Sequence, residues 1–201
     1  MMTSEKNGDS LTVKYVNCKG DIYYLHEGRM KTGIPQYFFS MKHDGLLAES
    51  VPEGYEIYEN PNGRVFLRRV VPKKVTDKEV SIVENAIRQF AQVKYFKIDV
   101  RENTITVYLP DQDLDPLINE FSALGLGNRS KFHELLKRNM YYSPMMRFIL
   151  AEEEGRRFVV ERMCFLGPED EWLFLEGPNN LSKLVKKYFP HLGKDSFFEL
   201  M

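Results

Sequence analysis

The stretch from residue 20 to residue 69 constrains the fold more than any other part of the chain. Short runs in which apolar and polar residues alternate are separated by segments rich in glycine, proline, asparagine and aspartate. Alternation with a period of two is typical of β-strands, and these four residue types favour chain reversals. The runs cover residues 22–26, 36–41, 55–58 and 64–70, and a weaker run covers residues 11–17. The sequence therefore predicts an N-terminal antiparallel meander of about five strands.

A second region is expected to begin near Pro72. Proline disfavours helical geometry in the residue before it, and residues 72–75 have little strand or core character. We therefore expect an antiparallel β domain at residues 1–72, with a flexible leader at residues 1–10. An α+β domain should follow at residues 73–201.

The second region opens with a helix signal. Thr76 and Glu79 have the spacing of a capping box, in which each side chain satisfies the other residue's backbone amide. Val80, Val83 and Ile87 then follow at helical spacing and define one apolar face. The pattern predicts a helix that starts at residue 77 and packs on a core.

The rest of the chain alternates between helical and strand patterns. The order of helix, hairpin and helix occurs twice with little residue identity, so a repeated unit is left as an open alternative. The fold class is α+β. The expected strands cover residues 95–100, 104–109, 147–150, 156–166 and 172–175, and the expected helices cover residues 111–124, 131–140 and 181–189, with a short one after 194.

Composition excludes several broad classes of function. The formal net charge of -1 gives no global attraction to nucleic acid or to an anionic membrane. No run approaches the roughly 18 apolar residues of a membrane span, and the first ten residues are polar. Cys18 and Cys164 are far apart and form no metal or redox motif. We expect a cytoplasmic protein with free thiols and no membrane partner.

No group of residues in the sequence matches a catalytic or metal-binding motif. Asp111, Asp113 and Asp115 have the spacing that opens a calcium loop, but Pro116 occupies the position that needs glycine. Acidic residues in a first helical turn are also favoured by the helix dipole, which explains this cluster without a metal. The four histidines show no ligand spacing and no nucleophile motif occurs. We predict no cofactor and no metal, and leave open an enzyme site assembled only in space.

The strand at residues 64–70 is the most basic candidate site. Alternation places Arg64, Phe66 and Arg68 on one face, and Arg69 follows directly. Arginines beside an exposed aromatic ring could stack bases and contact phosphates, as sheet-based single-strand binders do. The competing interpretation is that glutamates 53, 56 and 59 on the neighbouring strand neutralise the arginines.

The same region is also rich in tyrosine and phenylalanine. Tyr37 and Phe39 share one face of a strand, and the aromatic residues of neighbouring strands are too many for one face to bury. Such rings suit protein contacts because each adds a large apolar area. We therefore predict a noncatalytic binding module whose partner is another protein or a second copy of itself. It would use Tyr37, Phe39, Arg64, Phe66, Arg68 and Arg69, and nucleic-acid binding by the basic strand is the alternative.

Overall fold

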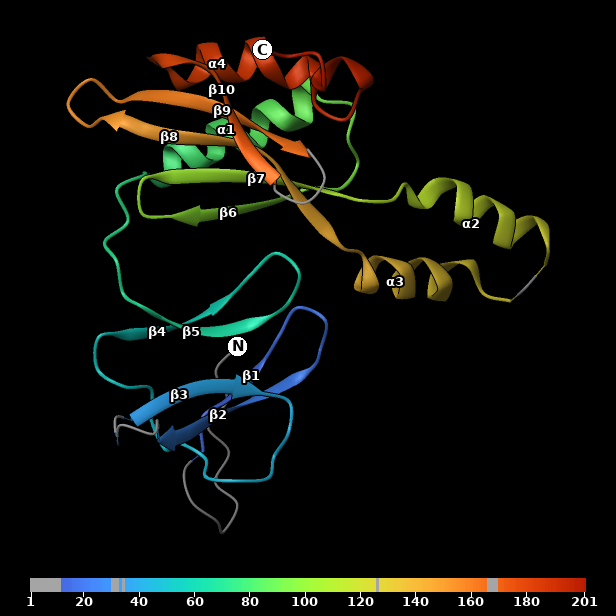
Figure 1. The fold of residues 1–201 in the computed structure, drawn as a ribbon. Coiled ribbons are helices and arrows are strands. Elements are labelled where there is room, and N and C mark those ends of the chain that lie inside the picture. Colours follow the sequence, from blue (N-terminus) through green and yellow to red (C-terminus); the bar gives the residue numbers. More distant parts are fainter. Residues whose placement is uncertain (1–11, 30–32, 34, 126, 166–169) are drawn as a thin grey trace. The chain divides into compact units, whose positions relative to one another are not determined.

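The computed structural model describes residues 12–29, 33, 35–125, 127–165 and 170–201 (Figure 1). Within these ranges it has ten strands, all paired antiparallel, and four α-helices, which confirms the predicted α+β class. The flexible leader predicted at residues 1–10 lies outside the described residues. The chain divides into two compact units: unit 1 comprises Met1–Val70 and Leu114–Asn139, and unit 2 comprises Val71–Asp113 and Met140–Met201.

The five strands expected before residue 70 are present in unit 1, but they form two sheets. One sheet has the order β1-β2-β3 and the other pairs β4 with β5, so the N-terminal meander has three strands instead of about five. The strands are β1 (Lys14–Val16), β2 (Ile22–Arg29), β3 (Pro35–Ser40), β4 (Tyr55–Glu59) and β5 (Val65–Arg69).

The segment between β3 and β4 explains this separation. The amide of Glu27 in β2 donates to Leu46 O at 3.0 Å, and the amide of Ala48 donates to Leu25 O at 2.8 Å. Because β3 already occupies one edge of β2, residues 46–48 must run along the other edge, beside β1. The chain therefore leaves β3 before β4 begins, and β4 does not continue the meander.

Polar contacts join the two sheets of unit 1. The side-chain amide of Asn17 is buried and donates to Gly63 O, in the β4–β5 turn, at 2.7 Å. Glu59 in β4 accepts from the Cys18 amide at 2.8 Å and from the Tyr15 hydroxyl at 3.0 Å. A buried amide left without a partner would cost about 1–3 kcal/mol, so Asn17 holds the turn in place.

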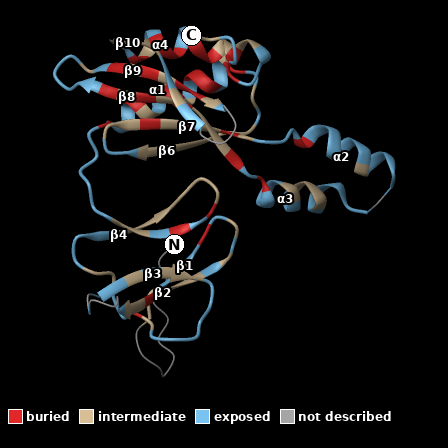
Figure 2. Cartoon of the chain, in the orientation of Figure 1, coloured by how far each residue is buried: buried red, intermediate tan, exposed pale blue. Residues whose placement is uncertain are grey.

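Unit 2 is built on one five-stranded sheet with the order β10-β9-β8-β7-β6. Its main core is formed by the sheet, the helices α1 and α4, and residues after α4, and Figure 2 shows the buried positions along these elements. The elements are α1 (Asp77–Phe90), β6 (Lys97–Arg101), β7 (Thr104–Pro110), β8 (Tyr142–Glu152), β9 (Arg157–Phe165), β10 (Asp170–Asn180) and α4 (Leu181–Tyr188). Two short 3-10 helices follow, at Phe189–His191 and Asp195–Phe197.

The predicted capping box of α1 is confirmed. The Thr76 hydroxyl accepts from the Glu79 amide at 3.3 Å, and the Glu79 carboxylate accepts from the Thr76 amide at 2.8 Å. Arg156 also donates to the Glu79 carboxylate, at 2.5 Å from Nη2. Val83 and Ile87, two residues of the predicted apolar face, are fully buried in the core.

The helices α2 (Leu114–Ala123) and α3 (Arg129–Asn139) form a hairpin in unit 1. Phe121 and Phe132 stack between them, with ring centroids 3.8 Å apart. The helix α2 begins later than the expected start at residue 111, because the amide of Asp111 donates to Tyr141 O at 3.0 Å and so extends the pairing of β7 with β8.

Glu176 in β10 gives unit 2 an acid-sensitive contact with α4. Its carboxylate accepts from Lys187 Nζ at 2.5 Å, from Asn179 Nδ2 at 3.1 Å and from the Tyr188 hydroxyl at 2.9 Å. The hydrogen bond from Lys187, followed by those from Asn179 and Tyr188, lowers the pKa of Glu176 from 4.5 to about 2. A depressed carboxyl pKa stabilises the folded state above pH 5, and this contribution is lost as the pH falls through 2.

We expect Glu176→Gln to lower the free energy of unfolding at pH 7 by about 1 kcal/mol, because solvent screens part of the interaction. The difference from the wild type should shrink steadily between pH 5 and pH 2. Urea unfolding followed by the fluorescence of Trp172, the single tryptophan, measures this. Glu171→Gln, on the same strand, is the matched control and should show no such trend. A difference that stays constant with pH would contradict the role of the Glu176 charge.

Candidate functional site

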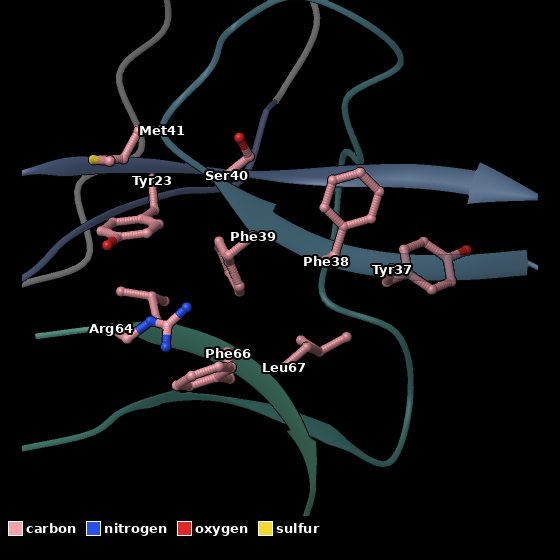
Figure 3. A pocket seen from close by; sticks show the side chains of 10 residues that line it. Tyr23, Tyr37, Phe38, Phe39, Ser40, Met41, Arg64, Phe66 and Leu67 are labelled. Carbon is pink, nitrogen blue, oxygen red and sulfur yellow. The ribbon is translucent and has the colours of Figure 1, made fainter.

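A cavity of about 540 Å³ lies between β3 and β5 of unit 1 (Figure 3). These strands belong to different sheets, so the cavity is bordered by the edges of both. We call it the aromatic cleft, because five of its lining residues carry aromatic rings. The rings belong to Tyr23, Tyr37, Phe38, Phe39 and Phe66, and the other lining residues are Ser40, Met41, Arg64, Val65 and Leu67.

The two faces of β3 play different roles in the cleft. In Figure 3, Phe39 points from β3 toward β5, whereas Phe38 points to the opposite side. This follows from the alternation of side chains along a strand. Phe38 is 47% exposed and stacks on the buried ring of His26, with centroids 5.2 Å apart. Phe66 on β5 is 41% exposed, so this ring offers substantial accessible area to the cleft.

The three arginines of the basic strand differ in their partners. Arg68 Nε donates to the Glu56 carboxylate at 2.7 Å, and its guanidinium lies 4.1 Å from the centroid of the Tyr58 ring. Glu56 and Arg68 are directly opposite in the β4–β5 register, so the expected cross-strand neutralisation occurs here.

The other two arginines are not neutralised. Arg64 lies 5.9 Å from the centroid of the Phe66 ring, and its guanidinium has no carboxylate partner among the residues that the structure describes. Arg69 is exposed and likewise has no carboxylate partner in the described part of the chain. Among the described residues, Arg64 is therefore a positive charge in the cleft lining without a carboxylate partner.

The structure brings four of the six predicted site residues together. Tyr37, Phe39, Arg64 and Phe66 line the aromatic cleft, whereas Arg68 and Arg69 do not.

The sequence did not identify Tyr23, Phe38, Ser40, Met41, Val65 or Leu67 as site residues, although Tyr23 and Phe38 belong to its aromatic strands. The position of Tyr23 depends on the β2–β3 register, which pairs Tyr24 with Ser40 and so brings Tyr23 to the end of β3 where Met41 follows. No local sequence signal specifies that register.

A further set of side chains comprises the acidic residues and the cysteines. Among the described residues, no group of three or more histidine, cysteine, aspartate and glutamate side chains could hold a metal ion. Glu161 forms an ion pair with Arg147 at 2.5 Å, across β8 and β9. Cys18 is exposed and Cys164 half-buried, and the two do not form a disulfide bond.

Comparison with protein-family models, with curated proteins and with solved structures finds no match to this chain. Within the described ranges, no helix combines the length and the apolar character needed to cross a membrane. The fold and the cleft therefore define an α+β protein with an aromatic cavity between two small sheets.

Proposed function

We propose that this protein is a noncatalytic binding module that recognises a segment of another protein in the aromatic cleft. The observation that carries this proposal is the combination of the aromatic rings of the cleft with the guanidinium of Arg64, which has no carboxylate partner among the described residues. Aromatic and arginine side chains are the residues that contribute most to binding at protein interfaces.

The chemistry of the cleft favours a ligand with two features. An apolar or aromatic side chain would bury its surface against Phe39, Phe66 and the tyrosines, and arrangements of aromatic rings add to the energy of that burial. A neighbouring carboxylate would pair with Arg64, since charge-assisted hydrogen bonds to guanidinium are the stronger kind. A cavity of about 540 Å³ has the size of an ordinary ligand site and accommodates one or two side chains of a peptide.

The contacts that join the two sheets support this function. Asn17 and Glu59 connect the β1–β2 side of unit 1 to the β4–β5 hairpin through hydrogen bonds of 2.7–3.0 Å. A cleft whose walls are already fixed loses less conformational entropy when a ligand binds. These polar contacts therefore favour recognition by a preformed site.

Nucleic-acid binding is the second candidate. It is favoured by the two arginines without carboxylate partners in the described ranges, Arg64 and Arg69, beside the exposed ring of Phe66. It is opposed by the pairing of Arg68 with Glu56 and by the formal net charge of -1. Binding of this kind depends on phosphate contacts and falls steeply with salt.

A peptide-display selection on the full chain, followed by calorimetry on the enriched peptides, tests the proposal. We expect the selected peptides to place an apolar or aromatic residue beside an acidic one. Arg64→Ala and Phe39→Ala should each weaken binding about tenfold or more. Arg69→Ala is the matched control, because it removes the same charge from the last residue of β5, outside the cleft lining, and it should leave affinity unchanged.

Two outcomes would count against peptide recognition in the cleft. Nucleic-acid binding would be favoured if Arg64→Ala and Arg69→Ala lowered the binding affinity equally and if single-stranded oligonucleotides bound in a salt-sensitive way. Peptides whose affinity is unaffected by Phe39→Ala would show that the cleft is not the site.

A further inference from the structure

Unit 2 contains a second cavity, separate from the aromatic cleft, with a volume of about 510 Å³. It lies where the ends of β7, β8 and β9 meet the segment that follows α4. Its apolar lining comes from Leu109, Met145, Phe165, Phe197 and Phe198. The side chains of Phe165 and Phe198 are 44% and 55% exposed, so a ligand in the cavity could reach both rings from solvent.

One wall of this cavity is fastened by a buried arginine. Arg162 in β9 is 5% exposed, and its guanidinium donates to Leu200 O at 2.7 Å and to Phe198 O at 3.1 Å. A third hydrogen bond, from Nη1, reaches Met163 O at 3.3 Å. Hydrogen bonds donated by a charged group stabilise a structure more than those between neutral groups. The segment that carries Phe197 and Phe198 is therefore held against β9, and the cavity is preformed.

The remaining lining residues of the cavity include three charged side chains. Asp111, Lys194 and Asp195 line the cavity, and within the described ranges none of the three has an ion-pair partner. Two carboxylates against one ammonium give the lining residues a formal charge of -1, while the buried Arg162 guanidinium lies behind the wall and donates to backbone carbonyls. An apolar pocket with a few polar groups is the usual form of a small-molecule site.

From this arrangement we infer that the second cavity binds a small apolar molecule that carries a cationic nitrogen. The apolar part packs on the exposed rings of Phe165 and Phe198, and the nitrogen lies at the carboxylates of Asp111 and Asp195. The two carboxylates select against an anion of the same size, because they are exposed and repel it, whereas the Arg162 guanidinium is buried and already donates to backbone carbonyls. The site concerns unit 2 alone and does not depend on the function proposed for the aromatic cleft.

Two probes with the same ring and opposite charges test this inference on the full chain. Tryptamine carries an ammonium group, and indole-3-propionate carries a carboxylate. Ligand-observed NMR titration should show that tryptamine binds at least tenfold more tightly. Asp111→Asn combined with Asp195→Asn should remove most of the preference for tryptamine over indole-3-propionate. Phe198→Ala should lower the affinity for tryptamine several-fold. Phe198 is exposed enough that this variant should fold.

Matched variants show whether tryptamine occupies this cavity or another part of the chain. Glu154→Gln removes an exposed acid in the turn between β8 and β9, outside the cavity lining of unit 2, and Arg64→Ala alters only the aromatic cleft, so neither should change tryptamine affinity. Arg162→Met should lower the affinity for tryptamine and also speed hydrogen exchange at the amides of residues 198 and 200. The reason is that Arg162 positions the segment that carries Phe198 without touching the ligand. Equal or tighter binding of indole-3-propionate, or no binding of tryptamine up to its solubility, would overturn the inference.

Discussion

Phe148→Ala is expected to lower the free energy of unfolding of unit 2 by about 3–5 kcal/mol, the range observed when a buried phenylalanine is truncated. Phe148 lies on β8, the central strand of the sheet, and is 0% exposed. It is paired with Ile105 on β7 and Val160 on β9, both fully buried. Its ring also meets Phe189 edge to face, with centroids 5.6 Å apart. The neighbours come from three directions, so the structure cannot collapse easily around the cavity that alanine would leave.

Urea unfolding followed by Trp172 fluorescence reports on unit 2, because this tryptophan lies in β10. Phe174→Ala removes the same side chain from the edge strand of the same sheet, where Phe174 is 56% exposed. We expect this control to change stability by less than about 0.5 kcal/mol. If Phe148→Ala and Phe174→Ala lowered the free energy of unfolding by similar amounts, the core of unit 2 would not be centred on β8.

Local signals in the sequence located most elements of the fold. The capping box of Thr76 and Glu79 placed the start of α1 at residue 77, because both partners lie within one helical turn. The turn residues between the N-terminal strands also predicted structure from local contacts. In the β4–β5 turn, the Asn60 side chain accepts hydrogen bonds from the amides of Asn62 and Arg64.

Features that depend on distant contacts were not predictable. The division of unit 1 into two sheets depends on hydrogen bonds from residues 46–48 to β2, and this short segment has no strand pattern of its own. The strand β8 begins at Tyr142, earlier than the expected 147, although it contains Pro144. Pro144 pairs with Tyr108 directly beside a register shift that leaves Met145 unpaired, and the ladder tolerates a proline at such an irregularity.

The candidate sites show the same limit. Tyr37, Phe39, Arg64 and Phe66 could be selected because their chemistry and strand alternation are local properties. The second cavity was not predicted, since its lining comes from the ends of three strands and a segment near the C-terminus. Such a site exists only once the sheet has been assembled.

Gly177→Ala is expected to destabilise unit 2 by about 3 kcal/mol or more. Gly177 has a φ of 143°, which residues with a side chain rarely adopt, and strain of this kind costs about 1–3 kcal/mol. An added Cβ would also lie 2.7 Å from Val159 Cα and 2.9 Å from Phe158 O. Because both atoms belong to the backbone of β9, no side-chain rotation relieves the clash, and overpacking adds about 1–3 kcal/mol.

Gly155→Ala is the matched control, in the turn between β8 and β9. Its φ is ordinary, and the nearest atom to an added Cβ is the end of the flexible Glu152 side chain, at 3.4 Å. We expect Gly155→Ala to change the free energy of unfolding by less than about 0.5 kcal/mol. The register of β10 against β9 shifts on both sides of Glu176, so the chain at Gly177 approaches β9 closely before Asn180 caps α4. A mild effect of Gly177→Ala would mean that β10 can move away from β9 there, which would also loosen the contacts of Glu176 with α4.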